Sequence, residues 1–118
     1  MGFGKFLAVF ALAFGLLAAS GAEADRFRYK KSFTLKLGET VNVYAVRHRD
    51  CESMPSFESI ERRLPDTVLG GFPDGGETTG KSRACDDVVP TRAIAFTAKK
   101  KGEETLEFFG YEVTLTVE

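Results

Sequence analysis

Apolar and polar side chains alternate along much of this chain beyond residue 24, and this period of two is what most constrains its fold. In 112–118, valine or leucine at every second position alternates with glutamate or threonine, which is typical of a strand with one buried and one solvated face. The same reading fits 33–37, 41–46, 94–98 and 105–108. The pattern predicts an all-β fold, an antiparallel β-sandwich of about six to eight short strands.

The first 24 residues have the pattern of a cleavable export signal. Lys5 gives a positive start, Phe6 to Ala19 is an apolar run, and Ala22-Glu23-Ala24 has the small residues that signal peptidase recognises. The apolar run is shorter than the roughly 20 residues that span a bilayer. We therefore expect 25–118 to be a single periplasmic or secreted domain, with no transmembrane segment after cleavage.

The chain has two cysteines, Cys51 and Cys85. Because exported compartments are oxidising, we expect a disulfide between them rather than a metal site or a nucleophile. It would close a loop of about 35 residues, worth roughly 3.5–4 kcal/mol of stability in the chain-entropy model. It would also bring the loop 51–57 close to the segment 70–83.

Two features of the chain resemble a known family. The segment Arg92–Ala98 (RAIAFTA), followed by Gly102, Phe108 and the strand 113–117, resembles the C-terminal half of small exported bacterial immunoglobulin-like, cadherin-like domains. In that family a cysteine followed by a proline comes after an early strand, and a second cysteine precedes a strand with a Phe/Tyr-Thr pair.

Cys51 with Pro55, and Cys85 ahead of Phe96-Thr97, match this layout. The resemblance implies an immunoglobulin-like sandwich and a binding or structural role, with no catalytic residues to carry over.

The middle of the chain fits two interpretations. Phe57, Ile60 and Leu64 have helical spacing, whereas Ile60, Arg62 and Leu64 alternate as a strand would. Pro65 ends either element, and we favour the strand. The glycine-rich, polar stretch 70–83 is interpreted as a long surface loop.

Two glycines near the C-terminus mark turns. Gly102 follows three lysines and is a good hairpin turn, and Gly110 indicates either a tight turn or a β-bulge.

One motif matches the phosphate-binding loop of nucleotide hydrolases, Gly75 to Ser82 (GGETTGKS). That chemistry needs a strand before the loop and a helix after it, so that backbone N–H groups face the phosphates. Only seven residues separate the motif from Pro90, and Asp86-Asp87 would repel a bound phosphate. We therefore expect a plain loop and no nucleotide.

Other candidate chemistries have weak support in the sequence. His48 is the only histidine and lacks partners for a metal site or a catalytic pair with Cys51. Asp74, Glu77 and Asp86-Asp87 have oxygen ligands of the kind calcium takes, but not the spacing of a known calcium loop. We expect no catalytic residues, no cofactor and no metal, so the chain is predicted not to be an enzyme.

Basic residues are the main candidates for binding. The formal net charge of −1 gives no long-range attraction to nucleic acid or to an anionic membrane, and we expect no nucleic acid partner. Arginines from separate segments can still gather on one face to bind a carboxylate or a polyanion. The candidate partner-binding residues are Arg47, His48, Arg49, Met54, Arg62, Arg63 and Arg83.

The expected function is a non-enzymatic binding or structural module of the bacterial envelope. It would bind an envelope or extracellular protein through loops at one end of the sandwich or through a sheet edge. One alternative is a chagasin-like protease inhibitor, because Gly38–Val41 and Thr78-Thr79-Gly80 resemble parts of that family's early turn and first inhibitory loop. The other alternative is a surface domain that binds polyanions or calcium.

Overall fold

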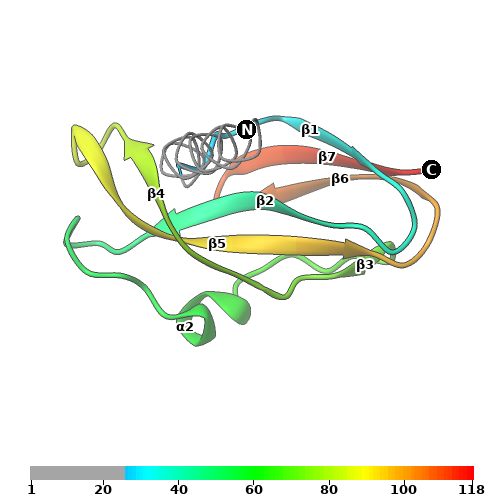
Figure 1. Cartoon of the computed structure of the whole chain (residues 1–118), viewed down its shortest axis with the longest axis horizontal. Coiled ribbons are helices and arrows are strands. Elements are labelled where there is room, and N and C mark those ends of the chain that lie inside the picture. The colour runs from blue at the N-terminus through cyan, green and yellow to red at the C-terminus, as the bar shows by residue number, and fades with distance from the viewer. Residues whose placement is uncertain (1–25) are drawn as a thin grey trace, which may run out of the picture.

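The computed structural model describes residues 26–118, and the predicted signal segment 1–24 lies outside them. The described chain forms two sheets and one short helix (Figure 1). In chain order the elements are β1 (Ser32–Leu35), β2 (Thr40–Arg47), α2 (Phe57–Glu61), β3 (Gly70–Gly71), β4 (Asp74–Ser82), β5 (Asp87–Ala98), β6 (Gly102–Phe108) and β7 (Tyr111–Val117).

The two sheets confirm the predicted all-β sandwich. One sheet has the order β1-β7-β6, and in the other the long strand β5 pairs with β2, β3 and β4. All pairs are antiparallel except β1 and β7, which run parallel. The predicted disulfide between Cys51 and Cys85 is also present.

The core lies between the sheets and follows the predicted alternation in β7, whereas the middle of β5, Ala93 to Phe96, is buried on both faces. Phe96 of β5 and Phe108 of β6 are fully buried at its centre. Alternate residues of the neighbouring strands complete the cluster, which also contains Leu35, Val43, Leu69, Ala98, Leu106, Val113, Leu115 and Val117. Burial of this apolar surface is the main force that holds the two sheets together.

The hairpin between β6 and β7 resolves the ambiguity at Gly110. Phe108 pairs with Tyr111, so only Phe109 and Gly110 lie between the strands. Their φ angles are +53° and +87°, the left-handed pair that a two-residue type I′ turn requires. Gly110 therefore marks a tight turn and not a bulge.

The strand favoured for 57–64 is wrong, because 57–61 form the helix α2. Ser56 caps its N-terminus by accepting a hydrogen bond from the Ser59 amide at 3.3 Å, and Ile60 is buried. The apolar spacing suited both elements, and the serine cap favours the helix.

The loop expected over 70–83 is also wrong, because most of this stretch forms β3 and β4. β4 pairs with β5 from Asp74 opposite Ile94 to Ser82 opposite Asp87. Its glycines permit close approach of the strands. A Cβ at Gly75 would lie 2.5 Å from Asn42 Oδ1 and 2.9 Å from Ala93. Glycine here signals tight packing between strands and not a flexible connection.

Candidate functional site

A pocket of about 700 Å³ lies where β2, β4 and β5 meet the turn between β6 and β7. Five lining residues are basic, namely Arg47, Arg49, Arg63, Lys81 and Arg83, and four are aromatic, namely Tyr29, Tyr44, Phe109 and Tyr111. We call this the cationic pocket. Its volume lies within the range of small-molecule sites in proteins.

The charge of the cationic pocket is not balanced from within the described chain. No aspartate or glutamate is among the described residues that line it. Between residues 26 and 118, salt bridges join Arg92 to Asp74 and Glu77, and His48 Nδ1 lies 3.2 Å from the Asp50 carboxylate; none of these residues lines the pocket. Such a group of like charges repels itself and attracts anions.

Two of the pocket arginines are held by contacts other than ion pairs. The Arg63 guanidinium lies 4.7 Å from the centre of the Phe109 ring, a cation–π contact. Arg47 donates from Nη1 to the His48 carbonyl oxygen at 3.0 Å. Each guanidinium has five N–H donors, so both keep donors for a ligand.

The aromatic residues of the pocket pack against one another around Tyr44. Its ring is stacked on Phe108 and Phe109 at 5.5 and 6.1 Å, and it meets Tyr29 edge-on at 5.4 Å. The Tyr29 hydroxyl donates to the Ala45 carbonyl at 2.9 Å. Burial raises the pKa of Tyr29 to about 12 and raises the pKa of Tyr44, so both phenols are neutral at physiological pH.

Thr91 of β5 contributes a buried hydroxyl to the pocket lining. Its side chain is 1% exposed, and Oγ1 has no hydrogen-bond partner within the described part of the chain. Gly80 of β4 keeps this region open, because a Cβ there would lie 3.3 Å from Thr91 Cγ2 and 3.4 Å from Tyr29 Oη. A buried hydroxyl without a partner is costly, so a ligand or water that bonds to it gains affinity.

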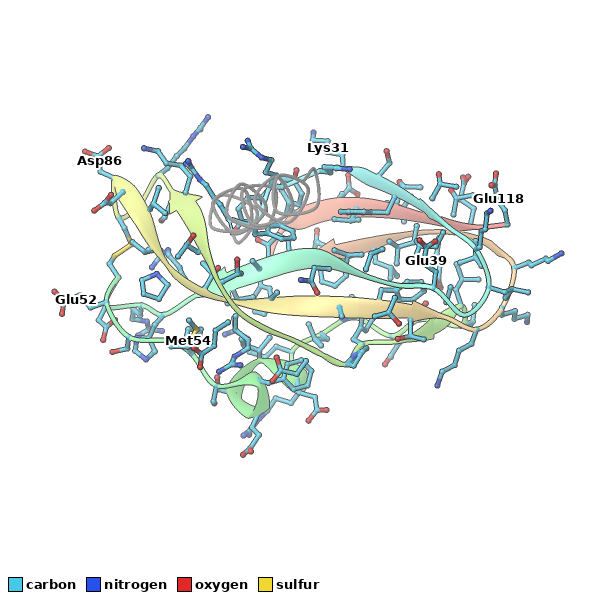
Figure 2. All side chains as sticks on the ribbon, in the orientation of Figure 1. Lys31, Glu39, Glu52, Met54, Asp86 and Glu118 are labelled. Carbon is cyan, nitrogen blue, oxygen red and sulfur yellow. A yellow bond between two sulfur atoms is a disulfide. The ribbon has the colours of Figure 1, made fainter. Side chains whose placement is uncertain are left out.

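The disulfide joins the two turns next to two of the pocket arginines. Cys51 follows β2 and Cys85 lies between β4 and β5, and the bond joins these turns with their Cα atoms 5.9 Å apart. Figure 2 shows it at the end of the molecule that carries the labelled residues Glu52 and Asp86. Arg49 and Arg83 each precede one of the cysteines by two residues.

The turn that carries Cys51 is ordered by Asp50. The Asp50 carboxylate accepts hydrogen bonds from the Ser53 amide, the Ser53 hydroxyl and the Glu52 amide. These bonds, with that from the Ser53 side chain the strongest, hold the pKa of Asp50 well below its usual range. The carboxylate is thus engaged with its own turn and is charged at neutral pH.

The structure brings together four of the seven candidate partner-binding residues, namely Arg47, Arg49, Arg63 and Arg83. The other three do not line the cationic pocket: His48 faces Asp50, Met54 is half-buried in the following loop, and Arg62 forms the C-terminal cap of α2.

Sequence reasoning did not select the other ten described lining residues, which include Tyr29, Tyr44, Lys81, Thr91, Phe109 and Tyr111. Lys81 belongs to the motif Gly75–Ser82, which was interpreted as a plain loop. The others come from separate segments, in strands, before β1 or in the β6–β7 turn, and no local signal marked them.

The nucleotide-loop motif and the inhibitor-like tripeptide both lie in β4. Gly76 to Ser82 pair with β5 in an antiparallel ladder, and the next element along the chain is a strand. Thr78-Thr79-Gly80 is therefore part of a sheet and not of a projecting loop.

The proposed calcium ligands are dispersed. Asp74 and Glu77 contact Arg92, whereas Asp87 pairs with Ser82 at the far end of the hairpin, roughly 20 Å along β5. Within 26–118 no three histidine, cysteine or acidic residues gather as metal ligands do.

No family model, curated protein or solved structure matches this chain. Among residues 26–118, no helix has the length and apolarity to cross a membrane.

Proposed function

We propose that this protein is a non-enzymatic exported binding module of the bacterial envelope, which binds an anionic group of its ligand in the cationic pocket. The observation that carries the proposal is that five basic residues, and no aspartate or glutamate, are among the described residues that line one pocket. The disulfide supports export, because such bonds persist in oxidising compartments.

The chemistry of the lining favours recognition. The lining contains guanidinium groups, an ammonium group and neutral hydroxyls, all of which donate hydrogen bonds to carboxylate or phosphate oxygens. The planar guanidinium of an arginine, such as Arg47, Arg49 or Arg83, can make two parallel hydrogen bonds to one carboxylate or phosphate. Bound negative charge would also relieve the repulsion among the five cations. Affinity should therefore fall as ionic strength rises.

The test is a titration of the oxidised protein with citrate, a small tricarboxylate, followed by amide NMR shifts. We expect the largest shifts at Arg47, Lys81 and Thr91, and weaker binding at higher salt. Shifts spread equally over the exposed Lys99–Lys101 run would contradict the proposal, because any exposed basic surface would then serve as well.

Charge reversal at the pocket provides the matched comparison. The Arg47→Glu/Arg83→Glu variant should bind citrate at least about tenfold more weakly, as expected from the loss of charged hydrogen bonds. Arg62→Glu changes an exposed arginine outside the pocket lining and should leave citrate affinity within about twofold.

A further inference from the structure

We infer that the ligand of the cationic pocket is an acidic saccharide, a sugar that carries carboxylate groups. This inference rests on the proposed function and narrows it to one ligand class. A sugar acid combines negative charge with many hydroxyl groups, and the lining offers partners for both.

The pocket supplies hydroxyls as well as cations. The Tyr44 and Tyr111 phenols and Thr91 Oγ1 make no hydrogen bond to any residue within 26–118. Thr91 is deeply buried, whereas Lys81 and Arg83, which also line the pocket, are exposed. A ligand with hydroxyls at the base of the pocket and carboxylates near these exposed cations satisfies both sets.

The arrangement of the rings favours a sugar over a nucleotide. A nucleobase binds by stacking on an accessible aromatic face. The Tyr44 ring is already stacked on Phe108 and Phe109, and Tyr29 meets Phe27, Tyr44 and Tyr111 edge-on. The rings are thus engaged with one another, and the phenol groups of Tyr44 and Tyr111 are left for a ligand.

An acidic peptide fits the same surface less well. A peptide gains affinity by adding a strand to an open edge or by inserting apolar anchors into pockets. The outer edge of β4 is bridged at Thr79, whose carbonyl accepts a hydrogen bond from the Phe27 amide at 2.8 Å. Of the exposed large apolar side chains of the described chain, only Tyr29 lines the pocket.

The experiment compares four probes by calorimetry with the oxidised protein. They are trigalacturonate, the neutral sugar galactotriose, the acidic peptide triglutamate and ADP. We expect trigalacturonate to bind with a submillimolar dissociation constant, at least about tenfold more tightly than each of the other three.

Each other result has a defined meaning. Equal or tighter binding of triglutamate, galactotriose or ADP would overturn the saccharide assignment. Citrate binding at the pocket without binding of trigalacturonate would overturn it too and leave the proposed function standing. Failure of both citrate and trigalacturonate to bind would overturn the two proposals together.

A pair of threonine variants tests the contact at the base of the pocket. Thr91→Val keeps the shape of the side chain and removes the hydroxyl, so trigalacturonate affinity should fall by about three- to tenfold. Thr105→Val removes an exposed hydroxyl, bonded to Thr114 on β7, and should leave affinity unchanged. Unchanged affinity of Thr91→Val, with a native-like NMR spectrum, would contradict a saccharide contact at this hydroxyl.

Discussion

At the scale of single residues, we expect the Thr91 hydroxyl to favour ligand binding and to lower the stability of the fold. The hydroxyl is buried without a partner among residues 26–118, so it contributes to the pocket at a cost to the fold. We expect Thr91→Val to raise the free energy of unfolding by about 1 kcal/mol in urea, because the penalty of the unpaired hydroxyl disappears. Most substitutions at fully buried positions destabilise, which makes the sign of this change informative.

Thr97→Val is the matched control for the effect of Thr91→Val on stability. Thr97 Oγ1 lies 2.8 Å from Thr40 Oγ1, so Thr97→Val breaks an existing hydrogen bond and should lower stability by about 0.5–1 kcal/mol. If Thr91→Val were destabilised as much as Thr97→Val, the Thr91 hydroxyl would have a partner in the folded protein.

Several arginines of the cationic pocket could be predicted from the sequence, whereas the hydroxyl groups and aromatic rings of the pocket could not. Arg47, Arg49 and Arg83 flank the cysteines, and a disulfide between the cysteines brings them together by covalent connection alone. Tyr44 and Tyr111 become neighbours only through sheet packing, which depends on strand order and register. Neither is fixed by the local alternation of side chains.

At the scale of elements, the glycines of β3 and β4 test whether close strand approach holds the second sheet together. Gly75→Ala places a methyl group 2.5 Å from Asn42 Oδ1 and 2.9 Å from Ala93, so the Asn42 side chain must move and β4 or β5 must shift. We expect a loss of about 2–3 kcal/mol of unfolding free energy, as for other overpacked sites. Thermal or urea unfolding measures it.

Gly71→Ala is the matched control, because a Cβ at Gly71 meets no atom within 4 Å. This variant should stay within about 0.5 kcal/mol of the parent protein, the usual range for open sites. Equal losses at both positions would mean that backbone freedom, and not contact between the strands, explains the preference for glycine in this segment.

The errors of the sequence analysis also belong to the scale of elements. Strands with strong alternation, such as β7, were predicted correctly because one face is buried and the other is solvated. β4 was taken for a loop because its glycines were interpreted as flexible, although Gly75 makes room for the neighbouring strands β2 and β5. The helix α2 is too short for periodicity to identify, and its cap at Ser56 was the better signal.

At the scale of the whole molecule, the disulfide joins two turns that otherwise belong to different parts of the fold. It connects the turn after β2 to the tip of the β4–β5 hairpin, which lie at the same end of the molecule (Figure 1). Arg49 and Arg83 each lie two residues before a cysteine, so the bond links the turns that carry two of the five basic residues of the cationic pocket. Stability and binding should therefore both depend on it.

The Cys51→Ser/Cys85→Ser variant measures both effects. We expect it to lose about 3–4 kcal/mol of unfolding free energy, because a loop of this length is no longer closed in the unfolded chain. Citrate affinity should also fall, since ordering the two turns again costs conformational entropy. Urea unfolding and calorimetry measure the two losses, at a temperature where the variant is folded.

A double-mutant cycle then separates a specific effect on the pocket from a general loosening. Arg49→Ala/Arg83→Ala should weaken citrate binding about tenfold in the disulfide-bonded protein and clearly less in the serine variant, where these side chains are no longer held at the pocket. If the arginine pair cost the same affinity in both backgrounds, the bond would stabilise the fold without positioning the charges. A smaller loss in the serine background would show that the disulfide links the stability of the sandwich to the arrangement of its binding site.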